Sequence, residues 1–316
     1  MDFILDEWKR GFTPEALTEI AGLWNANAAG RHAFYAWTGT LLERMLVANG
    51  RCLGRILSAR TNSGELAGWT HVTLLAEEGY PRAGVVEMLL VDRRFRRCGL
   101  GGALLEAGIS LLERQTPKPE FIDALGAWPY GCAYNALADG SERSGVFLSE
   151  AGLYRLFRCA GFEPVRKSLV MRASLADLAV RPPPRGGEFH ITPRREKTWL
   201  DRTFRGRELW DFNMTLADGN PLSRAIFGFM EGESRQEGKA IFSLFGVNTP
   251  IDLRNRGYAG INISHLMAHV AGLGGEVMEL HAYADNAPAL ALYRGLGFRE
   301  AAETMMLHRP GRRRPD

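Results

Sequence analysis

The chain has 316 residues, a net charge of +3 and 24% charged residues, which is typical of a globular protein of about two domains. Its basic residues are not clustered as in nucleic-acid-binding proteins, and no apolar run approaches the length of a membrane span, so we expect neither kind of partner. The first residues lack a basic region followed by an apolar core, so we expect a cytoplasmic protein.

The first half predicts alternating strands and helices. A helix begins at Thr13-Pro14, where threonine is a good N-cap and proline suits the first turn. Period-two and period-3.6 apolar patterns predict the other elements: strands at 3–8, 53–59, 66–75, 85–91, 121–125 and up to 171, and helices at about 31–47, from 100, and at 150–158. The four cysteines, Cys52, Cys98, Cys132 and Cys159, have no metal or redox spacing, so we predict no metal site and no disulfide framework.

A proline- and glycine-rich linker divides the chain. The run Arg-Pro-Pro-Pro-Arg-Gly-Gly at 181–187 favours an extended segment, so we place domains at 1–175 and 189–316 with a linker at 176–188. The second half repeats the order of the first, which indicates two copies of one domain. Its expected elements are strands at 189–192, 225–230, 240–247, 277–284 and 299–307, and helices at 198–209, after 257 and after 286.

Two short turns have the same pattern, R-x-x-G-x-G/A. One is Arg96 to Gly101 and the other is Arg254 to Ala259, and each follows an apolar run and begins a helical pattern. A strand, a tight glycine turn and a helix start bring backbone N–H groups together, and the helix dipole adds positive potential. Such a nest suits a pyrophosphate. The spacing fits neither the G-x-x-x-x-G-K-[ST] nor the G-x-G-x-x-G pattern.

The turns resemble the coenzyme A loop of the GCN5-related N-acetyltransferases. The segment Asn286 to Phe298 resembles a second signature of that family, N-x-x-A-x-x-x-Y-x-x-x-G-F. Because both halves carry the loop, the chain is similar to the tandem members of the family. The resemblance implies two α/β domains, each with a mixed sheet, that bind acetyl-coenzyme A. The cofactor-binding residues that it implies are Leu90, Val91, Arg96, Arg97, Cys98, Gly99, Leu100, Gly101, Val247, Asn248, Arg254, Asn255, Arg256, Gly257, Tyr258, Ala259 and Asn286.

The family resemblance also implies catalytic roles in the second half. Tyr293 would be the general acid toward the leaving thiolate, Asn286 would contact the pantetheine, and a backbone N–H near 246–248 would stabilise the oxyanion. The equivalent positions of the first half, 136 residues earlier, are Phe157 and Glu150, so that half lacks the acid. It is expected to bind the cofactor without chemistry, as in tandem relatives.

Other positions leave alternatives open. Tyr154 lies one helical turn before Phe157 and is a substitute acid, and Glu87 would be the base if the first half were active. Glu279 and His281 share one face of a strand and are base candidates or ordinary polar residues. In the expected acceptor-binding element, Trp210, Asp211 and Phe212 either line a pocket, with Asp211 attracting an amine, or belong to the core.

Three functions are consistent with these patterns. The first is transfer of acetyl from acetyl-coenzyme A to a small-molecule amine by a monomer or homodimer. The second is coenzyme A binding or sensing without turnover, and the third is acetylation of protein lysines or N-termini. The first half is also 22 residues longer between its loop and its Gly-Phe pair than the second, because the loop arginines are 158 positions apart and the Gly-Phe pairs 136. We therefore expect an insertion at about 129–150, near a ligand cleft or the contact between the halves.

Overall fold

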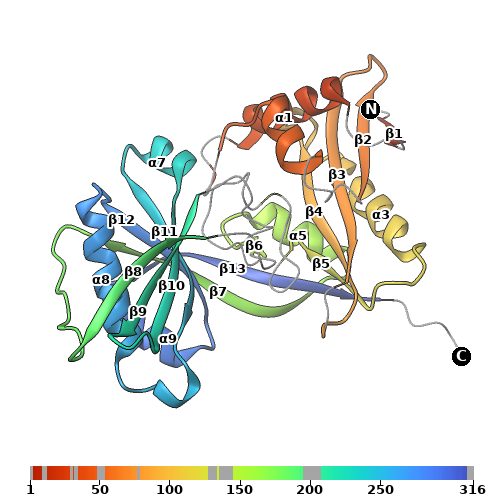
Figure 1. Ribbon diagram of the computed structural model, residues 1–316. Helices are drawn as coiled ribbons and strands as arrows, with labels where there is room; N and C mark the ends of the chain where they lie inside the picture. Colours follow the sequence, from red (N-terminus) through yellow and green to blue (C-terminus); the bar gives the residue numbers. More distant parts are fainter. Residues whose placement is uncertain are drawn as a thin grey trace, which may run out of the picture. The chain divides into compact units, whose positions relative to one another are not determined.

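The computed structural model describes residues 3–8, 13–28, 31, 35–47, 54–76, 79–126, 134, 145–194 and 208–311 (Figure 1). The described residues form two compact units. The first contains residues up to Arg166 together with Thr304 onward, and the second contains Lys167–Glu303. Each unit is a mixed α/β structure built around one sheet.

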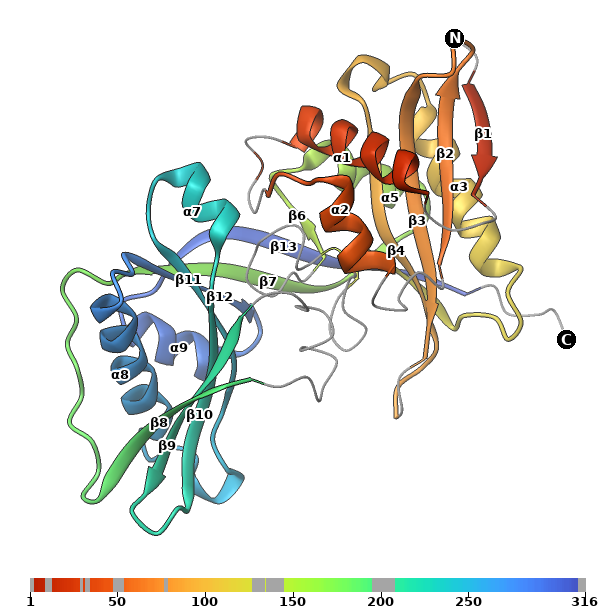
Figure 2. The same cartoon turned by 45° about the horizontal axis from the view of Figure 1, so that its top comes forward.

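The sheet of the first unit has the strand order β1-β2-β3-β4-β5-β13, with helices on both faces (Figure 2). Helices α1 and α2 cover one face through a core around Trp24, Trp37 and Trp69, and α3 and α5 cover the other through leucines and Phe157. The elements in the first part of the chain are β1 (Phe3–Glu7), α1 (Pro14–Ala28), α2 (Gly39–Leu42), η1 (Glu43–Val47), β2 (Arg55–Thr61), β3 (Leu66–Leu75), β4 (Ala83–Val91), η2 (Arg93–Phe95), α3 (Leu100–Glu113), β5 (Phe121–Ala124), β6 (Val146–Phe147), α5 (Ala151–Cys159) and β7 (Glu163–Ser174).

The sheet of the second unit has the strand order β7-β12-β11-β10-β9-β8. Helix α8 buries Ile263, Leu266, Met267 and Val270 at helical spacing against this sheet, and α9 adds Leu290 to the same core. The elements are β8 (Gly187–Pro193), β9 (Leu209–Leu216), β10 (Pro221–Phe229), α7 (Glu231–Glu237), β11 (Ile241–Asn248), η3 (Ile251–Leu253), α8 (Tyr258–Gly272), β12 (Val277–Tyr283), α9 (Ala287–Gly295) and β13 (Arg299–Pro310).

The two units exchange their last strands. In the first unit, residues 308–310 of β13 pair with β5 and residues 304–305 pair with β6. In the second unit, residues 168–174 of β7 pair with β12. The compact units therefore differ from the expected ranges 1–175 and 189–316 at these strands, because backbone pairing rather than sequence order decides which unit a strand completes.

Each exchanged strand carries a basic residue that is bonded to a buried acid on the strand next to it. Asp123 of β5 accepts a hydrogen bond from His308 Nε2 at 3.2 Å, and Glu279 of β12 accepts one from Arg172 Nε at 2.7 Å. Both carboxylates are almost completely buried. His308 and Arg172 are 136 positions apart, like the Gly-Phe pairs, so they are equivalent residues of the two halves.

Most expected elements are confirmed, with boundary shifts of a few residues. The helix expected at about 31–47 is wrong in its first part, because the described residues 35–38 are not helical and only 39–47 form α2 and η1. The elements that were not expected are β9, which occupies the predicted acceptor-binding segment, α7, the two-residue strand β6 and the short helices η2 and η3. The helix expected at 198–209 lies outside the described residues up to position 207, and Leu209 begins β9. Of the expected insertion at 129–150, only Tyr134 and residues 145–150 are described.

Candidate functional site

In each unit, two parallel strands separate at the same point. The ladder of β4 and β5 ends at Val86 and Ala124, and that of β11 and β12 ends at Leu244 and Leu280. Both long strands continue beyond this point, to Val91 and Asn248. Their described backbone groups past the split are not paired to the parallel neighbour and are available to a ligand.

Bulges increase the separation. In β4 the pairing with β3 shifts at Glu87, and in β11 the pairing with β10 shifts at Gly246–Val247. Gly246 has φ of 47°, and a Cβ there would lie 2.8 Å from Ile226 Cδ1, so only glycine fits without displacement. Of the expected oxyanion donors at 246–248, Gly246 and Val247 thus lie in the bulge, whereas Asn248 pairs with Arg224 of β10.

The two R-x-x-G-x-G/A turns have the same backbone conformation. Arg97 and Asn255 have φ of 64° and 61°, and Gly99 and Gly257 have φ of 88° and 83°. Each glycine is the residue before its helix, and a Cβ on either would meet no atom within 4 Å. The glycines therefore leave open space next to the free N–H groups of a helix start, which is the geometry of an anion-binding nest.

The first arginine of each turn braces it. Arg96 Nε donates to the carbonyl of Val91 at 2.9 Å, and Arg254 Nε donates to the carbonyl of Thr249 at 3.2 Å. Both bonds join residues five apart, at equivalent places. This contact fixes the turn against the end of the preceding strand and keeps the guanidinium beside the nest.

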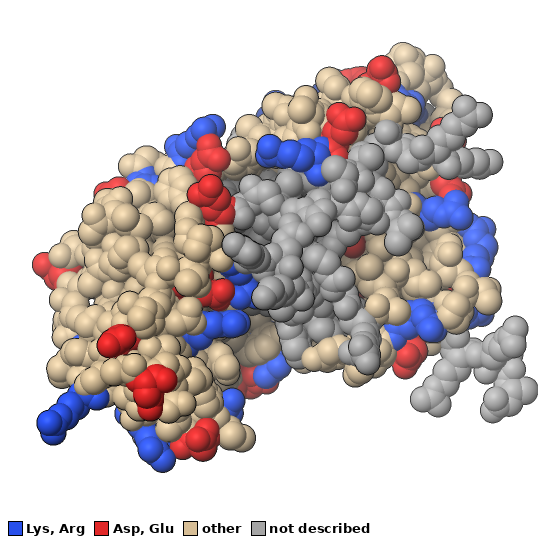
Figure 3. Space-filling view, in the orientation of Figure 1, with Lys and Arg blue, Asp and Glu red and all other residues tan. Residues whose placement is uncertain are grey.

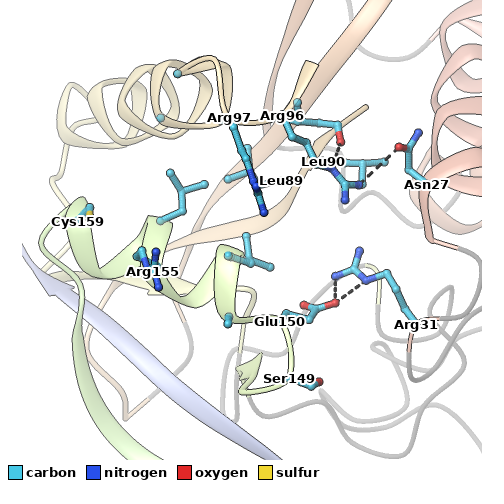
Figure 4. A pocket seen from close by; sticks show the side chains of 18 residues that line it. Asn27, Arg31, Leu89, Leu90, Arg96, Arg97, Ser149, Glu150, Arg155 and Cys159 are labelled. Carbon is cyan, nitrogen blue, oxygen red and sulfur yellow. Dashed lines mark hydrogen bonds and ion pairs between the residues drawn. The ribbon is translucent and has the colours of Figure 1, made fainter. Parts of the chain in front are cut away.

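A cavity of about 790 Å³ lies in the first unit between the turn, the end of β4 and helix α5. This volume is within the usual range for ligand and cofactor sites. Figure 4 shows Arg97 reaching into the cavity from the turn, and Arg155 and Glu150 lying on the α5 side. The cavity also contacts residues that the sequence did not suggest: Asn27, Arg31, Leu89, Gly102, Ser149, Arg155 and Cys159.

The cavity is rich in positive charge. Burial lowers the pKa of Arg96, and the neighbouring charge of Arg31 lowers it further. Glu150 forms an ion pair with Arg31 (Figure 4). With Arg97 and Arg155, the lining has four arginines and one glutamate, which favours an anionic ligand. Elsewhere, Figure 3 shows acidic and basic side chains interspersed over the described surface in view.

The helices beside the two sites start differently. Asn286 caps α9, because its side chain accepts a hydrogen bond from the N–H of Ala289 at 3.3 Å. Glu150 stands at the equivalent position before α5, makes no such cap and pairs with Arg31 instead. The first unit has thus replaced a small polar cap by an ion pair at the cavity wall.

The two equivalent aromatic residues also differ. Phe157 is fully buried and packs edge-on against Phe162 with ring centroids 5.0 Å apart. Tyr293 makes the same kind of contact with Phe298 at 5.8 Å but remains partly exposed. Only the second unit therefore has a hydroxyl-bearing side chain at this position. Tyr154 is also partly buried and packs on the core of the first unit.

The expected acceptor residues lie on β9. Phe212 is buried in the core beside Phe189 and Phe227, and Trp210 stacks on Phe227. Asp211 accepts a hydrogen bond from Arg194 Nη1 at 2.9 Å. This arrangement favours the core alternative for Phe212 and an ion-paired role for Asp211.

The base candidates are also engaged. Arg172 holds Glu279 and contacts Glu233 and Glu237 of α7 as well. Glu87 lies at the bulge of β4 with 2% exposure, and His281 is partly buried on β12. Among the described residues, no group of three or more histidine, cysteine, aspartate or glutamate side chains is placed to hold a metal ion.

These features fit a coenzyme A-type ligand. The two nests have open space at their glycines beside helix N-termini, where anions are favoured, the unpaired strand ends suit an amide-bearing chain, and the cavity of the first unit is basic. Arg31 and Arg155 escaped the sequence analysis because their place in the cavity depends on tertiary packing. Arg155 and Cys159 are four residues apart and so share one face of α5, but this spacing alone does not indicate a ligand site.

Family models match both halves. Residues 7–122 match the acetyltransferase (GNAT) family, and residues 236–307 match the FR47-like proteins. A mycothiol acetyltransferase of Clavibacter michiganensis subsp. michiganensis (strain NCPPB 382) is 30% identical over 234 residues, which is 72% of this chain and 72% of that protein. In the described part of the chain, every helix is too short or too polar to cross a membrane.

Solved structures share the fold. A tandem GNAT protein from the clavulanic acid biosynthesis pathway has a TM-score of 0.70 and 15% identity, covering 99% of this chain and 100% of that one. A GCN5-related N-acetyltransferase from Sphaerobacter thermophilus has a TM-score of 0.62 and 19% identity, covering 99% and 97%. A GCN5-related region of a fungal multi-domain β-N-acetylglucosaminidase has a TM-score of 0.69 and 12% identity. Here the match covers 97% of this chain but only 38% of the fungal chain.

Proposed function

Because the chain belongs to the GCN5-related N-acetyltransferase family, we propose that its second unit transfers acetyl from acetyl-coenzyme A to a small-molecule amine. The observation that carries this proposal is the matching pair of nests, each next to a split between parallel strands. An anion cradle beside unpaired strand amides suits a ligand with a diphosphate at one end and amides along its length.

The bound cofactor would supply the acetyl thioester. In our proposal the N–H groups at Gly257, Tyr258 and Ala259 hold the diphosphate, and Val247 and Asn248 bond to the pantetheine amides. An N–H of the bulged part of β11 donates to the carbonyl oxygen as negative charge develops during attack. A fixed donor at that point lowers the barrier, because it requires no reorganisation during the reaction.

Tyr293 is the proposed general acid. A phenol can give a proton, or a hydrogen bond, to the departing thiolate. Its position in the last turn of α9, the helix that Asn286 caps, and its partial exposure support this role. We do not assign the base to Glu279, because Arg172 holds that carboxylate in a buried ion pair.

The first unit has a different proposed role, as a cofactor-binding unit without turnover. Its cavity is basic, which supports binding, whereas buried Phe157 replaces the hydroxyl and Glu150 replaces the asparagine cap. The implied ligands are Leu90, Val91 and the turn from Arg96 to Gly101. The alternative for the whole chain is coenzyme A sensing, in which neither unit transfers acetyl.

The acceptor is tested with a panel of amines. The relative from Clavibacter is named mycothiol acetyltransferase, so the panel includes mycothiol that lacks its acetyl group, together with amino sugars, amino acids and lysine peptides. Acetylation of the lysine peptides, but not of the small amines, would favour the alternative that the enzyme acetylates proteins. Product is followed by mass spectrometry, since the exposed thiols of Cys98 and Cys159 would react with thiol reagents.

The decisive variant is Tyr293→Phe. Loss of a general acid should lower kcat by about 100-fold or more, with little change in KM for the cofactor. Tyr154→Phe in the first unit is the matched control and should leave kcat unchanged. Equal activity of Tyr293→Phe and wild type at all pH values would refute the assignment, and absence of product with every amine would favour the sensor.

A further inference from the structure

The linker places an arginine beside helices α8 and α9 of the second unit. Arg181 lies between β7 and β8, and its backbone is fixed at both ends: its N–H donates to Ser264 Oγ at 3.2 Å, and its carbonyl is 2.9 Å from His265 Nε2. The His265 ring itself stacks on Phe189 at 4.0 Å. Three prolines follow directly at 182–184 and limit the backbone further.

The Arg181 side chain reaches the start of α8 and the end of α9. A Cβ built on Gly260 would overlap Nη1 of Arg181 and lie 3.1 Å from its Cζ and 3.2 Å from Leu292 Cδ1. A Cβ on Gly295 would lie 3.9 Å from Nη2. Gly260 is the third residue of α8 and Gly295 the last of α9, so the guanidinium lies between these helices, near the turn at 254–259.

The equivalent place in the first unit is open. Gly102, Leu156 and Cys159 correspond to Gly260, Leu292 and Gly295, and all three line the basic cavity. A Cβ on Gly102 would meet no atom within 4 Å. The equivalent place therefore opens onto the cavity in the first unit and is occupied by a guanidinium in the second.

The two units supply a cation to this place from different elements. In the first unit, Arg155 of α5 lines the cavity. The equivalent residue of α9 is Ala291, which has no charge. Arg181 restores a positive charge from the linker. Arg181 is partly buried, and its guanidinium forms no ion pair or hydrogen bond with the side chains that the structure describes. Partial burial of an unpaired charge is costly unless an anion joins it.

We propose that Arg181 is a phosphate-binding residue of the second unit's cofactor groove. Its partner is a phosphate group of the coenzyme A nucleotide, either the phosphate on the ribose or the diphosphate next to the nest. This inference rests on the proposed function, since it assumes that the second groove holds the cofactor. The linker thereby becomes part of the binding site.

The test measures binding rather than turnover. Coenzyme A and dephospho-coenzyme A, which lacks the ribose phosphate, are titrated by calorimetry into wild type, Arg181→Ala and the control Arg185→Ala. Arg185 is an exposed arginine of the same linker. The titrations are done in a Gly99→Val background. A β-branched residue at φ of 88° disrupts the turn of the first unit, so that only the second unit's site for coenzyme A remains. If that background does not fold, the full chain is fitted with two sites.

Arg181→Ala should bind coenzyme A about tenfold more weakly, and Arg185→Ala should match its parent. Loss of discrimination against dephospho-coenzyme A places Arg181 at the ribose phosphate, and an equal loss for both ligands places it at the diphosphate. Unchanged or tighter binding by Arg181→Ala overturns the proposal. Failure of the unmodified protein to bind coenzyme A at all would instead overturn the proposed function.

Discussion

Arg172 should be the most sensitive charged residue of the second unit. Its guanidinium holds three carboxylates: Nε lies 2.7 Å from Glu279 Oε2, Nη1 lies 2.7 Å from Glu237 Oε1, and Nη2 contacts Glu233. Glu279 is fully buried and Glu233 is 2% exposed. Burial acts to lower the pKa of Arg172, but the charges of Glu279 and Glu233 outweigh it and raise the pKa, so the side chain stays charged.

Arg172→Met should therefore destabilise this unit by about 3–5 kcal/mol, because two buried carboxylates lose their cation. The control is Arg235→Met, which breaks the exposed pair of α7 between Arg235 and Glu231, four residues apart. Such pairs contribute about 0.3–0.5 kcal/mol. Arg172→Lys keeps the charge but not the three-way contact, and it should fall between the two.

Native-state hydrogen exchange is the appropriate assay, because it reports the opening free energy of β12 and α7 without assuming that both units unfold together. The expected result is a large loss of protection in β12 for Arg172→Met and none for Arg235→Met. If Arg172→Met changed the opening free energy of β12 by no more than the control, the reasoning about the buried ion network would be wrong.

Two further predictions concern the nest and a buried histidine. Gly257→Ala places a side chain at φ of 83° and should cost about 1 kcal/mol and weaken coenzyme A binding in calorimetry. Gly272→Ala, in open space at the end of α8, should do neither, and equal binding by both variants would contradict a nest at 257. Burial lowers the pKa of His71 to about 3, so the unfolded chain takes up this proton first and the first unit should lose stability as pH falls from about 6.5 to about 3. His71→Gln, followed by urea unfolding across this range, should flatten that dependence; an unchanged slope would assign it to other groups.

The sequence predicted the local parts of the site well. The turns at 96–101 and 254–259 and the cap at Asn286 depend on residues close in the chain, and the structure has both turns in one conformation and the asparagine at a helix start. The family resemblance and the mixed α/β fold are confirmed. The roles assigned to Tyr293 and to the cofactor-binding residues stay predictions.

The remaining features depend on contacts between distant segments. Strands β7 and β13 have similar apolar patterns, so their sequences could not reveal which sheet each one joins. Asp211 and Phe212 lie on β9, where pairing with β8 and β10 decides which side chain enters the core. Arg181 looked like one basic residue of a proline-rich linker, and only its packing on Gly260 indicates a ligand.

The exchange of strands determines when the first unit can finish folding during synthesis. Strand β5 pairs with residues 308–310, so the sheet of the first unit cannot close until residues 308–310 have left the ribosome. Expressed alone, the first half would contain β7 but not β13, and β5 would either accept β7 as its neighbour or remain an open edge that recruits other chains. Truncation before residue 304 should therefore damage the unit that is made first.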